Sequence, residues 1–173
     1  MQARESSAGA GPTPAIQLRI PSARDGAALW QLVRDAGTLE LNSTYFYVLF
    51  ADRFARTCAI AELDGRPIGV LIGFVPPDQP DTYFVWQVGV HPEARGNAIA
   101  RRMIASVVAR HPRVRFVEAT VASGNAPSDA LFRSLARHLR AEIKVTGGYP
   151  STLFPAPHDA ERLYRIGPFE VSS

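Results

Sequence analysis

An apolar strand that runs through a short turn directly into a helix is the feature that most constrains this chain. The stretch from Val88 to Ala100 reads VGVHPEARGNAIA, with small residues where the helix begins. The first backbone N–H groups of a helix lack acceptors, and the helix dipole places partial positive charge beside them. Gly96 and Ala98 would let a phosphate approach these groups, because a larger side chain would stand in the way. The stretch therefore predicts a diphosphate site made by the backbone.

The rest of the chain alternates strand and helix patterns. Strands are predicted over residues 17–21, 56–63, 66–75, 83–90, 114–121 and 163–166, and helices over 22–36, 43–54, 96–110 and 127–139. Ser22 is the expected N-cap of the first helix and Gly37 its end, while Asp64 and Gly65 form the turn of a hairpin. This order predicts an α/β fold in which helices flank a mixed central sheet.

Length and composition indicate one domain. With 173 residues, of which 46% are hydrophobic, the chain can build a full core over residues 16–173, preceded by a flexible tail over 1–15. The tail lacks the apolar run of a signal peptide, and no stretch reaches the roughly 18 to 20 apolar residues that span a bilayer. Cys58 lies in an apolar run and is expected to be a buried core residue. We therefore predict a cytoplasmic protein that does not bind membranes.

The charge pattern does not indicate a nucleic-acid partner. The net charge is +3, but the arginines are scattered and form no continuous basic stripe. Arg101 with Arg102, and Arg133 with Arg137 and Arg140, fit solvated helix faces. A mildly positive surface suits the attraction of a cofactor that carries several phosphates. The sequence contains no cluster of Cys or His typical of a metal site, and we predict no metal.

Several short sequence words give a resemblance to a known family. Arg95, Gly96 and Ala98, directly after an apolar strand, resemble the acyl-coenzyme A loop of the GNAT N-acetyltransferase superfamily. Within it the chain is similar to the diaminobutyrate acetyltransferase family over about residues 16–167. That similarity rests on residues 39–45 (LELNSTY), 57–62 (TCAIAE), 75–81 (VPPDQPD), 84–88 (FVWQV), 131–136 (LFRSLA), 153–154 (LF), His158 with Glu161, and 163–168 (LYRIGP).

The resemblance implies the GNAT acyl-CoA N-acyltransferase fold and an acetyl-CoA co-substrate. It implies transfer of acetyl to the side-chain (N4) amine of L-2,4-diaminobutyrate, on the way to the compatible solute ectoine, by direct attack in a ternary complex. Val88, Gly89 and Val90 would pair with the pantetheine arm, and an N–H near Val88 would stabilise the oxyanion. The diphosphate would bind the backbone of Arg95, Gly96, Asn97, Ala98, Ile99 and Ala100, and Asn125 would contact the cofactor arm.

Candidate catalytic groups follow from the chemistry of the amine. Because an amine with a pKa of about 10.4 is protonated at neutral pH, the site needs a group that removes a proton. Two regions offer one, namely Glu40 with Asn42 in the loop between the first two helices, and His158 with Glu161 near the end. Trp86 could form an aromatic wall for the substrate, and Tyr45 supplies a hydroxyl.

Each candidate also has a structural interpretation. Glu40 and Asn42 could simply serve to cap the following helix, for which Asn42 or Ser43 would make a good N-cap, and His158 and Glu161 could be a surface pair on a short helical turn. Trp86 could be a core residue and Tyr45 a structural one, and Asn125 could be only an N-cap. The base stays open among Glu40, His158, Glu161 and an ordered water.

Two departures from the family pattern widen these alternatives. Phe132 stands where many GNAT enzymes have a tyrosine that protonates the leaving thiolate, and Gln87 stands where some relatives have a carboxylate base. An acetyltransferase for another small amine or a peptide, and a non-catalytic acyl-CoA-binding module, are the rival functions. Exposed strand edges lead us to expect a homodimer.

Overall fold

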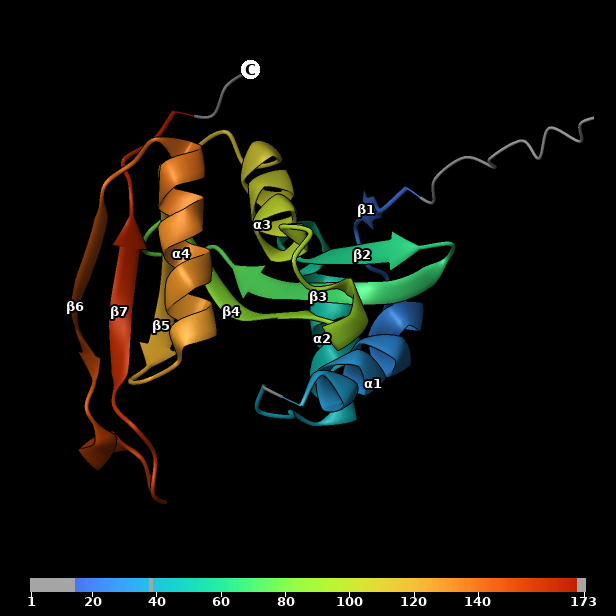
Figure 1. Ribbon diagram of the computed structural model, residues 1–173, viewed down its shortest axis with the longest axis horizontal. Helices are drawn as coiled ribbons and strands as arrows, with labels where there is room; N and C mark the ends of the chain where they lie inside the picture. Colours follow the sequence, from blue (N-terminus) through green and yellow to red (C-terminus); the bar gives the residue numbers. More distant parts are fainter. Residues whose placement is uncertain (1–14, 38, 171–173) are drawn as a thin grey trace, which may run out of the picture.

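The computed structural model describes residues 15–37 and 39–170, so nearly all of the predicted tail over residues 1–15 lies outside it. One sheet and four α-helices make up the described part (Figure 1). The strands are β1 (Gln17–Arg19), β2 (Ala59–Leu63), β3 (Arg66–Phe74), β4 (Thr82–Val90), β5 (Phe116–Ala122), β6 (Ile143–Tyr149) and β7 (Glu161–Ile166). The helices are α1 (Gly26–Ala36), α2 (Thr44–Arg53), α3 (Ile99–Ala109) and α4 (Ala126–Leu139).

The sheet is mixed, as the sequence predicts, and its strands lie in the order β1-β2-β3-β4-β5-β7-β6. Every neighbouring pair is antiparallel except β4 and β5, which run parallel. These two strands pair only from Thr82, opposite Phe116, to Phe84, opposite Glu118. Beyond Phe84 they diverge, and Figure 1 shows β4 running away from β5 and α4. The sheet is therefore open between its two central strands.

Two apolar clusters cover the two faces of the sheet. One cluster joins α1 and α2 to β2 and β3 and includes Tyr47, Ile60 and Ile72. The other joins α3 and α4 to the opposite face and includes Met103 and Phe132. Burying a large apolar side chain contributes about 1.5 to 3 kcal/mol, so these clusters hold the helices against a sheet that is itself divided. The sequence prediction of helices flanking a mixed sheet is confirmed.

Local signals placed several element ends correctly. Ser43 is the N-cap of α2, because its Oγ accepts the N–H of Phe46 at 3.2 Å. Gly37 ends α1 in the left-handed conformation, with φ of 65°. The hairpin turn between β2 and β3 uses positive φ at both Asp64 and Gly65, as its sequence predicts.

Other predicted boundaries are wrong. Residues 22–36 do not form one helix, because a 3₁₀ turn over Ala23–Asp25 precedes α1, and another over Ala55–Thr57 delays β2 until residue 59. The helix predicted from residue 96 begins at Ile99, since Gly96 and Ala98 adopt positive φ.

The edge strand β6 was not predicted. Its sequence, IKVTGGY, contains two glycines and little apolar alternation, and its side chains are mostly exposed. Pairing with β7 fixes it in place, which local sequence does not reveal. Nowhere in residues 15–37 and 39–170 is there a helix with the length and apolarity needed to cross a membrane.

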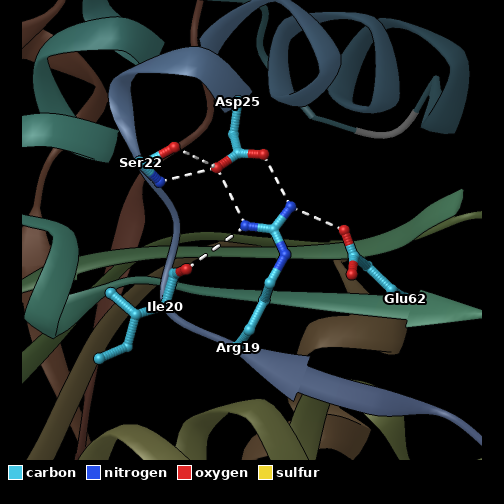
Figure 2. A network of polar contacts seen from close by, with 5 residues as sticks. All are labelled: Arg19, Ile20, Ser22, Asp25 and Glu62. Atoms are coloured by element: carbon cyan, nitrogen blue, oxygen red, sulfur yellow. Dashed lines mark hydrogen bonds and ion pairs between the residues drawn. The ribbon is translucent and has the colours of Figure 1, made fainter. Parts of the chain in front are cut away.

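An ion-pair network ties β1 to the start of α1 (Figure 2). The Arg19 guanidinium donates to both carboxylate oxygens of Asp25, at 3.0 and 2.7 Å, and to Glu62 Oε1 at 2.7 Å. The Asp25 carboxylate also accepts the N–H of Ser22 at 2.7 Å. Arg19, aided by the Ser22 N–H, lowers the pKa of Asp25 from 3.8 to about 2.

The Asp25→Asn variant tests this network through the pH dependence of stability. A carboxylate whose pKa is lowered by folding stabilises the protein above its unfolded pKa, and the contribution disappears as the pH falls through its folded pKa. Because Arg19 is 38% exposed, solvent reduces the effect, and we expect Asp25→Asn to cost about 1 kcal/mol near pH 7. Urea unfolding should show this difference shrinking toward about pH 2.5. An equal difference at both pH values would contradict the assignment.

Candidate active site

The loop between β4 and α3 presents backbone N–H groups as the sequence predicts. Gly96 and Ala98 have φ of 87° and 52°, and Ala98 is the N-cap of α3. Within the described part of the chain, the N–H groups of Gly96 and Asn97 have no acceptor within hydrogen-bonding distance. Successive N–H groups in such a conformation, at a helix N-terminus, form a concave anion site. The backbone can therefore accept a diphosphate here.

Arg95 connects this loop to the ends of β4 and α1. Its guanidinium donates to the carbonyl oxygens of Val90 and Ala36, both at 3.3 Å, and Asn97 Nδ2 donates to the Ala94 carbonyl at 3.2 Å. Both side chains bind the protein itself. The Arg95 N–H donates to the Pro92 carbonyl at 3.3 Å, so of these two residues Asn97 is the one whose backbone N–H has no acceptor among the described residues.

The last part of β4 has a free side. Val88, Gly89 and Val90 pair with β3, but β5 has already diverged on the other side. Val88 and Val90 pack against the α3–α4 cluster, and Gly89 is buried beneath Leu39, whose Cδ1 would lie 2.8 Å from a Cβ at that position. Extended backbone with one unpaired side can bind another extended chain as a further strand would.

A β-bulge in β4 directs Trp86 outward. Ile72 pairs with Gln87 while Gly73 pairs with Val85, so Trp86 is the extra residue of β4. Its side chain is 50% exposed, and its ring centre lies 5.9 Å from that of Phe46 and 6.3 Å from that of Phe74. The core interpretation of Trp86 is therefore wrong, and the ring is free on one side to contact a ligand.

Polar contacts hold the loop of residues 39–43 against β4. Gln87 is 6% exposed, and its Nε2 donates to the Glu40 carbonyl at 2.6 Å. The Tyr47 hydroxyl donates to Gln87 Oε1 at 3.2 Å and accepts the Asn42 N–H at 3.3 Å. Capping falls to Ser43, so the capping interpretation of Glu40 and Asn42 is wrong. The contacts use the Glu40 and Asn42 backbone and leave their side chains for other partners.

His158 and Glu161 form a pair, but not on a helical turn. Glu161 is the first residue of β7, opposite Ala122, and His158 Nε2 lies 3.9 Å from its Oε1. The imidazole stacks on Phe154 with ring centres 3.9 Å apart, and Nδ1 lies 2.6 Å from the Asp159 carbonyl oxygen. The stack and the Nδ1 contact orient Nε2 toward Glu161.

Strand alternation places Glu161 on the sheet face that carries Trp86. Tyr164 and Ile166 belong to the α3–α4 cluster, so Glu161, at odd spacing from Tyr164, points to the other face. Arg165, on that same side of β7, binds Glu118 of β5. Trp86 of β4 and Glu161 of β7 thus point to one face of the sheet, on opposite sides of the opening between β4 and β5. Glu40 lies in the loop bound to β4, and His158 precedes β7.

Of two further predicted residues, Asn125 has a structural contact and Tyr45 is exposed. Asn125 caps α4, since its Oδ1 accepts the Ser128 N–H at 3.1 Å, and its cofactor contact stays a prediction. Tyr45 is 70% exposed on the first turn of α2. Its role in substrate binding also stays a prediction.

A phenol beside Phe132 was not anticipated from the sequence. Phe132 is buried, with its ring centre 6.0 Å from that of Tyr164, whose hydroxyl donates to Asp129 at 2.8 Å. Burial and Asp129 raise the pKa of Tyr164, while Arg133 and Tyr164 lower that of Asp129. Tyr164 therefore stays protonated and donates its hydroxyl hydrogen bond to Asp129. This contact requires β7 and α4 to be adjacent.

The Cys58 thiol is buried in the core. Cys58 is 1% exposed, and burial raises the pKa of its thiol to about 11. A thiol so held is a poor acyl carrier. Among the described residues, no group of three or more His, Cys, Asp or Glu side chains could hold a metal ion.

The fold and the divided sheet define a class of protein. The Acetyltransferase (GNAT) family model matches residues 27–136, and the chain belongs to this family. YncA, a putative acetyltransferase from Salmonella typhimurium with its cofactor acetyl-CoA, shares the fold with a TM-score of 0.65 at 17% identity, over 92% of this chain and 95% of its own.

More similar relatives identify the branch of that family. L-2,4-diaminobutyric acid acetyltransferases from Streptomyces avermitilis and Virgibacillus pantothenticus are 42% and 40% identical, covering 88% and 86% of this chain and 88% and 96% of their own lengths. Diaminobutyrate acetyltransferase EctA from Paenibacillus lautus, solved with L-2,4-diaminobutyric acid and coenzyme A, superposes with a TM-score of 0.86 at 39% identity, over 93% of this chain and 99% of its own. The chain is thus a member of the L-2,4-diaminobutyric acid acetyltransferase family.

The concave site formed by the backbone N–H groups at Gly96 and Asn97, here called the cradle, leads us to expect that Gly96→Ala impairs cofactor binding. An L side chain at φ of 87° is strained, and its Cβ would occupy open space beside the loop where we expect the diphosphate. We expect a KM for acetyl-CoA about tenfold higher, equivalent to about 1.4 kcal/mol. Gly65→Ala is the matched control, because Gly65 also has positive φ and open space but lies in the β2–β3 turn. Equal KM values for both variants would argue against the cradle.

Sequestration of Cys58 predicts that the thiol takes no part in turnover. Iodoacetamide should leave the native protein unlabelled and label it fully in denaturant. Cys58→Ser should retain the wild-type kcat, although it places a hydroxyl in the core and lowers stability by about 1 to 3 kcal/mol. Loss of turnover in a folded Cys58→Ser protein would indicate a covalent route.

Proposed function

We propose that this protein transfers the acetyl group of acetyl-CoA to the N4 amine of L-2,4-diaminobutyrate. The observation that carries the proposal is the close structural match to EctA, whose structure contains that amino acid and coenzyme A, in a chain whose own sheet opens between β4 and β5. The product is N4-acetyl-L-2,4-diaminobutyrate, and we place the reaction in ectoine biosynthesis.

Acetyl-CoA would bind along the free side of β4. Its diphosphate would accept hydrogen bonds from the backbone of residues 95–100, and its pantetheine arm would pair with Val88, Gly89 and Val90. Asn125, at the start of α4, would border the arm on the β5 side. The thioester would then lie near the bulge at Trp86, where an N–H close to Val88 would stabilise the oxyanion.

Glu161 is the group we propose as the general base. Its side chain is 19% exposed and its Oε1 lies 3.9 Å from His158 Nε2, whereas Glu40 is exposed and has no side-chain partner among the described residues. Glu161 takes a proton from the ammonium, and the N4 lone pair attacks the carbonyl carbon. The second N4 proton passes to water as the tetrahedral intermediate collapses, and the C–S bond breaks to release coenzyme A. The thiolate, with a pKa of about 8.5, takes its proton from solvent, since Phe132 has none to give.

Glu40, Asn42 and Tyr45 would bind the polar groups of the amino acid, while Trp86 contacts its methylene stem. Such a site rejects amines of another length, because a wrong chain leaves charged groups without partners. The chain is expected to act as a homodimer in the cytoplasm, and both of these stay predictions.

A substrate panel tests the proposed function against its rivals. Release of free thiol from acetyl-CoA should be fastest with diaminobutyrate and slower by at least about tenfold with ornithine, lysine and polyamines. Equal rates with another amine would favour a different GNAT substrate. Binding of acetyl-CoA without thiol release from any amine would indicate a non-catalytic module.

Substitution of Glu161 tests the base. Glu161→Gln should lower kcat by about 10² to 10⁴ at neutral pH and leave the Kd for acetyl-CoA unchanged, because the amide cannot accept the proton. Glu170→Gln is the control, since Glu170 is 92% exposed near the C-terminal end of the described chain. Retention of kcat in Glu161→Gln would move the base to Glu40, His158 or water.

A further inference from the structure

Gln87 is a buried amide in a part of β4 that is otherwise apolar from Phe84 to Val90, and its contacts lead away from β4. A buried amide is costly unless its polar atoms find partners, and those of Gln87 find them in the loop of residues 39–43 and in α2. The Nε2 contact to the Glu40 carbonyl, at 2.6 Å, crosses between segments far apart in sequence. Gln87 thus joins the strand that carries Trp86 to the loop that carries Glu40.

The Tyr47 hydroxyl completes the connection. It is fully buried, accepts the Asn42 N–H and donates to Gln87 Oε1, so its acceptor and donor capacities are both used. The loop is therefore attached at two backbone points, the Glu40 carbonyl and the Asn42 N–H. Chains of hydrogen bonds in a low-dielectric interior are more rigid than single ones.

Neighbouring contacts limit the loop at its other positions. Leu39 packs on Gly89, and Ser43 caps α2. With its backbone fixed from residue 39 to residue 43, the loop presents Glu40 as an exposed side chain. Its position relative to Trp86 is then set by Gln87, the residue next to Trp86 in β4.

We propose that Gln87 and Tyr47 are positioning residues that set the affinity for diaminobutyrate by holding the Glu40–Asn42 backbone against β4. This proposal rests on the proposed function, because it assigns Glu40 and Asn42 to the amino-acid site. Neither residue contacts a reacting atom. Their loss should weaken amino-acid binding while leaving the cofactor site unchanged, because that site uses the backbone of Val88 to Val90, which β3 holds in place, and the loop before α3.

Tyr47→Phe is the first test, and Tyr83→Phe is its matched control. Both tyrosines are fully buried, and the Tyr83 hydroxyl also makes one buried contact to a backbone carbonyl, that of Thr57, at 2.8 Å. Tyr47→Phe should raise the KM for diaminobutyrate about tenfold and leave the KM for acetyl-CoA unchanged. Tyr83→Phe should change neither, although it also removes a buried hydrogen bond.

Gln87→Met provides an independent variant with similar length and no amide. It should raise the same KM, and the Tyr47→Phe/Gln87→Met double variant should raise it by less than the product of the two single effects, because both changes break one chain of contacts. If Tyr47→Phe raises the KM no more than Tyr83→Phe does, or if the two changes multiply fully, the proposal is overturned.

Amide hydrogen exchange separates failure of this proposal from failure of the proposed function. The Asn42 amide should exchange at least about tenfold faster in Tyr47→Phe than in the wild type or in Tyr83→Phe. If the wild type does not acetylate diaminobutyrate, the proposed function fails, and with it the assigned ligand, while the exchange result still decides whether the loop is held. Unchanged exchange of Asn42 in Tyr47→Phe would overturn the positioning role by itself.

Discussion

The short pairing between β4 and β5 is the constraint on which the rest of the structure depends. Three residue pairs connect these parallel strands before they separate. From residue 85 onward, the side of β4 that faces β5 therefore has no strand partner. Backbone polar groups are costly to leave unsatisfied, so this side favours an extended ligand that carries amides of its own. The pantetheine arm of coenzyme A is such a ligand, and the loop before α3 supplies N–H groups for its diphosphate.

The same division places the candidate catalytic and binding side chains on two separate strands, β4 and β7. β4 carries Trp86 and, through Gln87 and Tyr47, the loop with Glu40. β7 carries Glu161, whose Oε1 lies 3.9 Å from His158 Nε2. Because Glu161 and Trp86 point to the same face of the sheet, an amine on that face would meet a thioester lying in the opening. The α3–α4 cluster contains Val85 of β4 and Tyr164 of β7, so it joins these two strands on the opposite face of the sheet.

Local sequence patterns predicted the parts of the fold that local physics decides. The serine cap at Ser43, the left-handed glycine at Gly37 and the turn at Asp64 and Gly65 follow from side-chain capping and allowed φ values. The pattern did not reveal β6, whose strand conformation depends on pairing with β7. It left Trp86 open between a ligand wall and a core residue, because the outward turn of its side chain follows from a change of register against β3. The contacts of Gln87 with Glu40 and Tyr47 join distant segments, and only a polar residue within an apolar strand hinted at them. Residue types around the site were thus predictable, whereas their connections required the tertiary fold.

A crystal structure of this protein with acetyl-CoA and diaminobutyrate tests the central claim most directly. The account predicts the pantetheine arm between β4 and β5, hydrogen-bonded to the backbone of Val88 to Val90, with the diphosphate on the N–H groups from Gly96 to Ala100. It predicts the N4 amine of the amino acid on the sheet face shared by Trp86 and Glu161. A cofactor bound elsewhere, with the free side of β4 in contact only with solvent or with another protein segment, would contradict it.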